Sequence, residues 1–99
     1  MPWQLREYSI KPGEMEAWIE EWRAKIVPLR RQYGFHVVGA WTVEGADRFV
    51  WIIRYDGPKS WQEADADYYS SAERKAVDPD PARHLDDTKA RLMSEVRAD

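Results

Sequence analysis

Residues 35–55 hold the feature that most limits how this chain can fold. Two segments rich in β-branched and aromatic residues lie there, 35–43 and 48–55, and residues 44–47 form a linker of hairpin length between them. An antiparallel sheet with one face in water shows polar and apolar residues in alternation. These segments are instead apolar at both alternating sets of positions. The pattern predicts a hairpin with both faces covered, one by the chain's own helices and the other by a second copy of the chain.

The segments before the hairpin predict a strand and then a helix. Residues 3–10 have strand composition and end at a turn containing Pro12 and Gly13. Apolar side chains then recur every three or four positions through residues 15–33, which is typical of an amphipathic helix. Pro28 lacks a backbone N–H and clashes with the preceding turn. We therefore expect a kink or break beside Val27.

The segments after the hairpin predict a second helical region and a last strand. Serine is followed three residues later by glutamate at 60–63 and again at 70–73, and this spacing predicts two helix starts. Residues 87–96 predict an edge strand that carries charged side chains. The order is that of an α+β, ferredoxin-like βαββαβ domain, in which strands one and three are central in a four-stranded antiparallel sheet. We expect a single domain over residues 1–99, with both helices on one face of the sheet.

Composition excludes several classes of function. The net charge is −3 and no basic stripe is interleaved with aromatics, so nucleic-acid and anionic-membrane partners are not expected. The chain has no cysteine, and no segment approaches the roughly 20 apolar residues of a membrane span. Residues 1–4 do not begin a secretion signal. These features predict a cytoplasmic protein. Six Trp and five Tyr supply more apolar area than a small core needs, which indicates an interface or a ligand pocket.

Four segments of the chain resemble a bacterial NIPSNAP-type domain. They are LREYSIKPG at 5–13, IVP at 26–28, VGAW at 38–41 and RFVWIIRYDG at 48–57. The resemblance implies the dimeric α/β-barrel superfamily, in which two ferredoxin-like sheets face each other with the helices outside. That superfamily includes small monooxygenases of aromatic polyketides, haem-degrading oxygenases, lactone isomerases and polyketide cyclases. The resemblance supplies no shared catalytic motif, so it implies a fold and a homodimer but no reaction.

The hairpin also predicts a ligand pocket. If Val43 lies opposite Arg48, then His36 lies opposite Tyr55, and one sheet face carries aromatic side chains beside small ones. Such a face suits an apolar pocket with a few orienting polar groups. Tyr68 and Tyr69, on the second helix, would close the pocket. The alternative is that this face is simply packed core. The predicted ligand-binding residues are Trp51, Tyr55, Tyr68 and Phe49.

Titratable residues offer few catalytic candidates. The only histidines are His36 and His84, and His36 is the predicted acid–base residue because it lies on an aromatic strand. No ligand spacing supports a metal site, and no cofactor is expected. Haem is the alternative, with His84 or His36 as axial ligand. In the first strand, Arg6 and Glu7 point to opposite faces, so one is buried. A buried Glu7 is expected to pair with Arg54 and fix the sheet register.

The sequence therefore predicts a small homodimeric domain that binds an apolar or aromatic molecule between sheet and helices. It leaves open whether this is an enzyme. If it is, cofactor-free oxygenation, isomerisation or cyclisation is the expected chemistry. The alternatives are a non-catalytic structural or interaction protein, in which the aromatics serve only core and dimer, and a haem-binding or haem-degrading protein.

Overall fold

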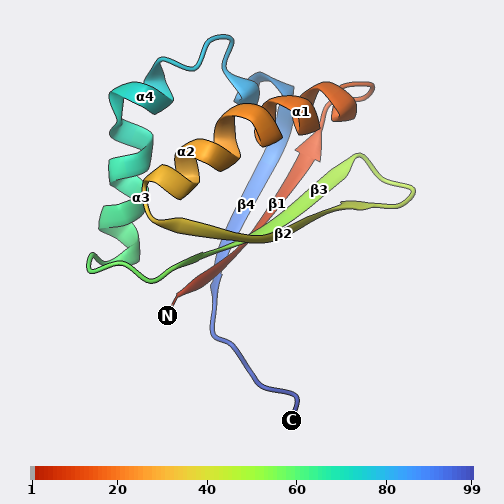
Figure 1. Ribbon diagram of the computed structural model, residues 1–99. Coiled ribbons are helices and arrows are strands. Elements are labelled where there is room, and N and C mark those ends of the chain that lie inside the picture. The colour runs from red at the N-terminus through yellow and green to blue at the C-terminus, as the bar shows by residue number, and fades with distance from the viewer. Residues whose placement is uncertain (1) are drawn as a thin grey trace.

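The structure is a computed structural model that describes residues 2–99, and it consists of one sheet with a helical layer on one side (Figure 1). The predicted domain began at Met1, which lies outside the described residues. The strands are β1 (Trp3–Ile10), β2 (Phe35–Val43), β3 (Arg48–Tyr55) and β4 (Leu85–Met93). The helices are α1 (Met15–Glu21), a π-helical segment (Trp22–Ile26), α2 (Val27–Gln32), α3 (Trp61–Ser70), α4 (Ala72–Lys75) and a 3₁₀ helix (Pro81–His84).

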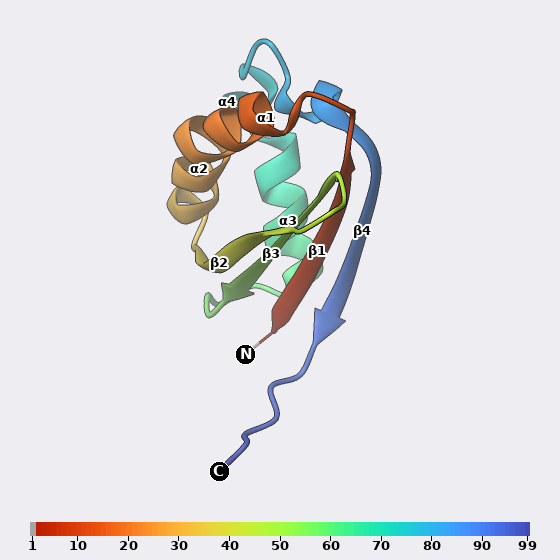
Figure 2. The same cartoon turned by 90° about the vertical axis from the view of Figure 1, so that its right-hand side faces the viewer.

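The sheet has the predicted topology. Its strand order is β2-β3-β1-β4, and each neighbouring pair is antiparallel. The first and third strands are therefore central, and β4 is an edge strand that ends at Met93 rather than at residue 96. Figure 2 shows all helices on the same side of the sheet. The predicted α+β, ferredoxin-like βαββαβ fold is confirmed.

The first helix is interrupted close to the predicted position. Residues 22–26 form a π-helical turn, in which the Val27 N–H donates to the Trp22 carbonyl five residues earlier. Pro28 provides the physical reason, because its ring crowds the carbonyl of the preceding turn and a widened turn gives it room. The irregular turn thus lies just before the proline. Gly34, at φ +91°, then allows the chain to leave α2 for β2.

The second helical region begins with the predicted cap. The Ser60 hydroxyl accepts from the Glu63 N–H at 3.2 Å and lies 3.0 Å from the Glu63 carboxylate. The second predicted cap was wrong by one residue. Ser71, in an extended conformation, accepts from the Arg74 N–H at 3.0 Å, whereas Ser70 is still in the last turn of α3.

The predicted hairpin register is correct at one end and wrong at the other. Val43 pairs with Arg48 and Ala40 with Trp51, as expected, but the register shifts between Val37 and Gly39. His36 consequently pairs with Arg54 and not with Tyr55. The reason is a bulge in β2. One extra residue there moves the side chains that precede it in the chain, including His36, to the other face of the sheet.

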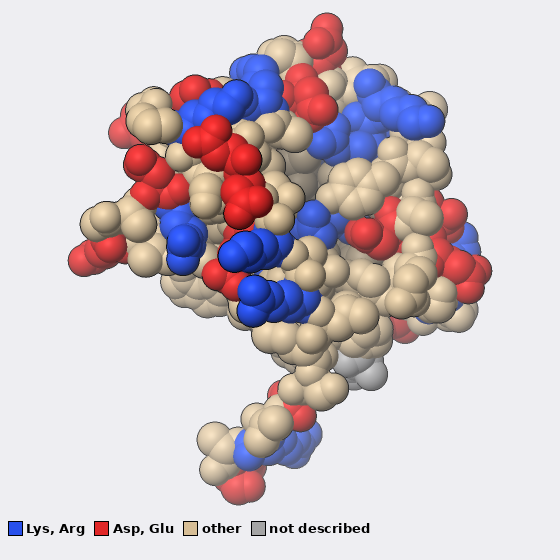
Figure 3. Space-filling view, turned by 180° about the vertical axis from the view of Figure 1, so that it is seen from behind, with Lys and Arg blue, Asp and Glu red and all other residues tan. Residues whose placement is uncertain are grey.

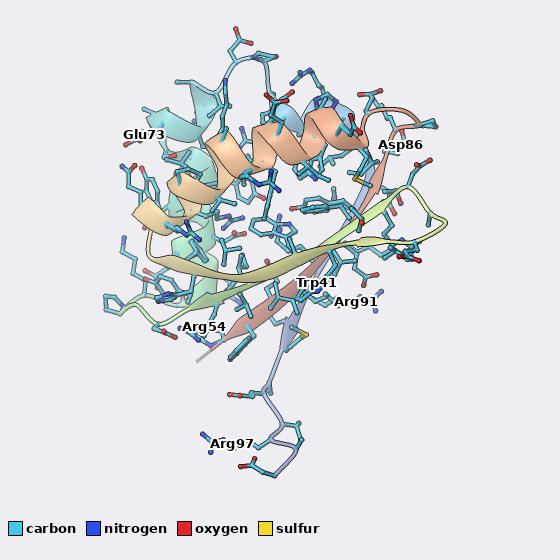
Figure 4. The ribbon with its side chains drawn as sticks, turned by 45° about the vertical axis from the view of Figure 1, so that its right-hand side comes forward. Trp41, Arg54, Glu73, Asp86, Arg91 and Arg97 are labelled. Atoms are coloured by element: carbon cyan, nitrogen blue, oxygen red, sulfur yellow. The ribbon has the colours of Figure 1, made fainter. Side chains whose placement is uncertain are left out.

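The two faces of the sheet differ strongly. The helix-covered face carries a network of edge-to-face aromatic rings, including Trp22 with Trp51 at 5.6 Å and Tyr8 with Trp18 at 5.5 Å between ring centroids. We call the opposite side the open face, because no described helix covers it. Figure 4 shows Trp41, Arg54 and Arg91 projecting from it. Its apolar residues are Trp3, Leu5, Trp41, Val43, Val50, Ile52 and Met93.

Candidate functional site

A cavity of about 220 Å³ lies between the sheet and the helical layer. Strands β1, β3 and β4 form its floor, and each helical segment contributes at least one residue to its walls or mouth. Figure 3 shows a recess near the centre of the face seen from behind, with basic atoms at its edge. The lining residues are Arg6, Tyr8, Trp18, Ile26, Arg30, Trp51, Tyr68, Tyr69, Arg74, Ala82, Leu85 and Thr88. We refer to this space as the sheet–helix cavity.

The predicted site residues do not all lie at one site in the structure. Trp51 and Tyr68 line the sheet–helix cavity, and each is only 1% exposed. Phe49 and Tyr55 are buried on the same face of the sheet but lie outside the cavity lining. His36 lies on the open face, with a half-exposed side chain 3.4 Å from Asp56. A catalytic role for His36 stays a prediction, but the residue cannot act on a ligand in this cavity.

Arg6 is the charged residue that β1 buries. Alternation along the strand places Gln4, Arg6 and Tyr8 on the helix-covered face and Glu7 on the open face. Of the two residues, Arg6 is therefore the buried one, and the pairing expected for a buried Glu7 with Arg54 does not arise. Arg54 instead lies 3.2 Å from Asp56. Arg6 is 7% exposed, and among residues 2–99 no carboxylate lies within ion-pair distance of it.

Neutral side chains hold the Arg6 guanidinium in place. It donates to the Tyr8 hydroxyl at 2.7 Å, to the Gln4 side-chain oxygen at 2.6 Å and to the Tyr69 hydroxyl at 2.7 Å. Burial by itself lowers the pKa of Arg6, but its interactions with Tyr8, Tyr69 and, more weakly, Asp65 outweigh burial and the net pKa is raised. The cavity therefore contains a permanent positive charge.

Arg30 brings a second guanidinium to the same wall. It is 1% exposed, and it donates to Asp65 at 2.8 Å and to the Tyr69 hydroxyl at 3.3 Å. Its guanidinium carbon lies 3.9 Å from the centroid of the Tyr68 ring, which is cation–π geometry. The Tyr69 oxygen thus accepts from two guanidinium groups. Its own hydroxyl proton is left to donate to a further acceptor.

Several polar atoms of the cavity residues have no partner in the described part of the chain. All are buried, and all can donate a hydrogen bond. Unsatisfied buried donors are rare in folded proteins, because each loses its water without replacement. They are Trp18 Nε1, Trp51 Nε1, Arg30 Nε, Arg74 Nε and the Tyr68 hydroxyl. The residues that line the cavity therefore hold a surplus of buried donors.

The hydroxyls of Tyr8 and Tyr68 stay protonated near neutral pH. Burial raises the pKa of Tyr8, and the opposing effect of Arg6 is smaller. Burial likewise raises the pKa of Tyr68, against the smaller effects of Arg30 and Arg74. Neither hydroxyl supplies a negative charge to balance the arginines.

His84 forms a separate cluster between the 3₁₀ helix and α1. Its Nδ1 lies 2.7 Å from Glu14 and its Nε2 lies 2.9 Å from Glu21, while Arg83 donates to both oxygens of Glu21. Both ring nitrogens are therefore engaged, and the geometry does not fit an axial haem ligand. Hydrogen bonds to Glu21 and Glu14 raise the pKa of His84, and the hydrogen bond from Arg83 is the largest effect that lowers the pKa of Glu21 to about 2.

This cluster makes stability depend on pH. Because the folded pKa of His84 is above its unfolded value, its contribution is full below about pH 6.5 and is lost as the pH rises through the folded pKa. We expect the free energy of unfolding to fall over that range in the wild type. In His84→Gln this part of the pH dependence should disappear, whereas His36→Gln, at an exposed site, should retain it. Urea denaturation across the range measures this, and an unchanged profile in His84→Gln would contradict it.

Sequence reasoning missed the arginines, and it placed Tyr69 at the pocket without its hydrogen bonds to them. One signal was present, because Arg6 shares the alternating positions of Tyr8 and Ile10 in a strand predicted to be central. Arg30 similarly lies four residues after Ile26, on the apolar side of its helix. Nothing in the sequence brings Tyr69 to both of them, because that contact joins segments 63 residues apart in the chain.

Within residues 2–99, no three His, Asp or Glu side chains are grouped so that they could hold a metal ion. None of the helices found there has the length and hydropathy that a membrane crossing needs.

The class of protein that these features define is a ferredoxin-like fold with an arginine- and aromatic-lined cavity under its helices. The NIPSNAP family model matches residues 3–97, and the chain belongs to the NIPSNAP family. No protein with a curated description matches the chain.

Solved structures share the fold at low sequence identity. A NIPSNAP family protein of unknown function from Agrobacterium tumefaciens superposes with a TM-score of 0.86 at 16% identity, covering 100% of this chain and 91% of that one. An uncharacterised NIPSNAP domain protein from Burkholderia xenovorans gives 0.84 at 16% identity, covering 99% and 97%. A putative antibiotic biosynthesis monooxygenase from Nitrosomonas europaea gives 0.70 at 17% identity, covering 98% and 100%. These similarities extend to the fold and no further.

Proposed function

We propose that this protein binds a small aromatic molecule in the sheet–helix cavity. The observation that carries the proposal is an aromatic-lined space of about 220 Å³ whose lining residues include several buried donors without a partner. Ligand sites are typically apolar pockets with a few convergent polar groups, and this cavity has that composition. A ring would pack against Trp51 and Tyr68, while an acceptor atom would receive hydrogen bonds from the arginine and tyrosine groups.

The chemistry proposed for the bound molecule is cofactor-free oxygenation, isomerisation or cyclisation. Such reactions develop negative charge on a ring or carbonyl oxygen, and preorganised donors in a water-poor site stabilise that charge. Arg6, Arg30 and the Tyr69 hydroxyl are arranged to do so. The fold is shared with a protein named as a putative antibiotic biosynthesis monooxygenase, which is consistent with chemistry of this kind.

We also propose that the protein is a homodimer joined through its open faces. Trp41 is 52% exposed and Val43 is 41% exposed in β2, and central apolar residues of β1 and β3 lie beside them. Large exposed apolar patches are unusual on monomers and are typical of interfaces. The same patch favours the alternative function, a non-catalytic interaction protein, if the cavity binds nothing.

The ligand proposal predicts which tryptophans respond to a neutral single-ring compound. With phenol at about 1 mM, we expect the indole N–H signals of Trp18 and Trp51 to shift in NMR spectra, because they line the cavity. The signals of Trp3 and Trp41 on the open face should not shift. Tyr68→Phe should weaken phenol binding by about three- to tenfold, since it removes one hydrogen bond without disturbing a partner.

Tyr33→Phe is the matched control for this experiment. Its hydroxyl donates to Glu73 at an exposed position, and its ring packs against Tyr68 at 6.2 Å between centroids. It should leave phenol binding unchanged. Shifts confined to Trp3 and Trp41, or no shifts at all, would reject the cavity as a ligand site and leave the interaction protein as the better account.

A further inference from the structure

The charges around the sheet–helix cavity do not balance. Three arginines line it, namely Arg6, Arg30 and Arg74, and no acidic residue does. Arg30 is paired with Asp65 at 2.8 Å and Arg74 with Asp80 at 3.0 Å. Arg6 has no carboxylate partner among residues 2–99. One positive charge is therefore left over.

That remaining charge is buried, and this makes it costly. An ion removed from water is stable in a protein only when hydrogen bonds and an opposite charge replace its hydration. The three partners of Arg6 are Gln4, Tyr8 and Tyr69, which satisfy three of its five N–H groups and include no carboxylate. Two N–H groups have no partner among residues 2–99, and no carboxylate there pairs with the charge.

The hydrogen bonds from Arg6 and Arg30 also determine that the Tyr69 hydroxyl acts as a donor toward a ligand. The hydroxyl oxygen of Tyr69 accepts from Arg6 at 2.7 Å and from Arg30 at 3.3 Å. A hydroxyl that accepts twice from guanidinium groups is left with its proton to donate. Arg6 and Tyr69 thus present donors side by side, which suits the two oxygens of one carboxylate.

We infer that the sheet–helix cavity binds a monoanion, a single aromatic ring that carries one carboxylate, with the carboxylate on Arg6 and Tyr69. This inference rests on the proposed function and specifies its substrate class. Because Arg6 is the one cavity arginine without a carboxylate partner among residues 2–99, we expect the ligand to carry a single negative charge. The volume sets the size, because a cavity of about 150 Å³ is enough for benzene and about 220 Å³ leaves room for one small substituent.

The test compares two compounds of the same shape on the wild-type protein. Benzoate and benzamide differ in charge but hardly in volume, and isothermal titration at neutral pH measures both affinities. We expect benzoate to bind at least about tenfold more tightly, because hydrogen bonds to a charged partner are about twice as strong as neutral ones. This comparison needs no variant, so it does not depend on whether a variant folds.

Two variants then assign the preference to Arg6. Arg6→Met should bind benzoate and benzamide about equally, and Arg6→Lys should retain part of the preference because it keeps the charge. The control is Arg54→Met, which removes an arginine from the open face, where its side chain is 30% exposed. That variant should show the wild-type preference. Circular dichroism on each variant confirms that it is folded.

The outcomes separate this inference from the proposal on which it rests. If both compounds bind with equal affinity and shift the Trp18 and Trp51 signals, the cavity is a ligand site but the monoanion inference is wrong. If the preference for benzoate persists in Arg6→Met or is lost in Arg54→Met, the inference is also wrong. If neither compound nor phenol binds at about 1 mM, the proposed function fails and the inference fails with it.

Discussion

Replacing Trp51 with alanine is expected to lower the free energy of unfolding by about 3–5 kcal/mol. Trp51 is 1% exposed in a central strand, and its ring packs edge-to-face against Trp22 at 5.6 Å and Tyr8 at 6.4 Å. Its removal joins the space that it occupied to the existing cavity, and the surrounding β-sheet cannot collapse to fill it. For a domain of this size such a loss is a large part of the total stability. Urea denaturation followed by far-UV circular dichroism measures it.

Trp41→Ala is the matched control for that substitution. Trp41 lies on the neighbouring strand, one position after the residue that pairs with Trp51, but on the open face and 52% exposed. At low protein concentration its replacement should cost less than about 1 kcal/mol. Under the dimer proposal its cost should grow with protein concentration, whereas that of Trp51→Ala should not. Equal losses for the two variants at low concentration would contradict the burial described for Trp51.

The substitution Ile52→Asp is expected to dissociate the proposed dimer. Ile52 lies near the centre of the open face, opposite Leu5 on one neighbouring strand and Gly39 on the other. In a dimer joined through these faces, a carboxylate there would be buried without a partner, at a cost of about 3 kcal/mol or more. That corresponds to a dissociation constant raised by at least about 100-fold. Sedimentation equilibrium of wild type and variant provides the measurement.

Ser70→Asp is the control, because it adds the same charge at an exposed position on α3, on the far side of the sheet. It should leave the association unchanged. A wild-type protein that sediments as a monomer, or an Ile52→Asp variant that remains dimeric with unchanged stability, would reject the dimer proposal. Since the helix-side core does not involve Ile52, a monomeric variant should still show the far-UV spectrum of the wild type.

The parts of the fold that sequence predicted well are those set by local periodicity and capping. The β-branched and aromatic composition of residues 35–55 and their short linker predicted the hairpin, Ser60 and Glu63 predicted the start of α3, and Pro28 predicted the irregular turn beside it. Each of these depends on residues within one or two turns of one another, so the sequence alone determines them. The second cap was misplaced from Ser71 to Ser70, because adjacent serines offer the same local signal.

The candidate site was predicted less well, and a single bulge accounts for much of the difference. The extra residue at Val38 sends His36 to the open face, away from Trp51 and Tyr68. Bulges respond to twist and to packing between strands, which a regular alternation of side chains does not reveal. The predicted aromatic wall was therefore partly right, while the predicted acid–base residue belongs to the other side of the sheet.

By itself the sequence determined the βαββαβ order, the central strands, the helix-covered side and the excess of aromatic side chains. Only the tertiary structure decided which polar groups meet. Arg6, Arg30 and Tyr69 come from a strand and two helices, and the hydrogen bonds among them span 39 to 63 positions of the chain. Local periodicity acts over a few residues, whereas these contacts depend on how the helices pack across the sheet. The buried, unbalanced charge of the cavity is a property of that packing.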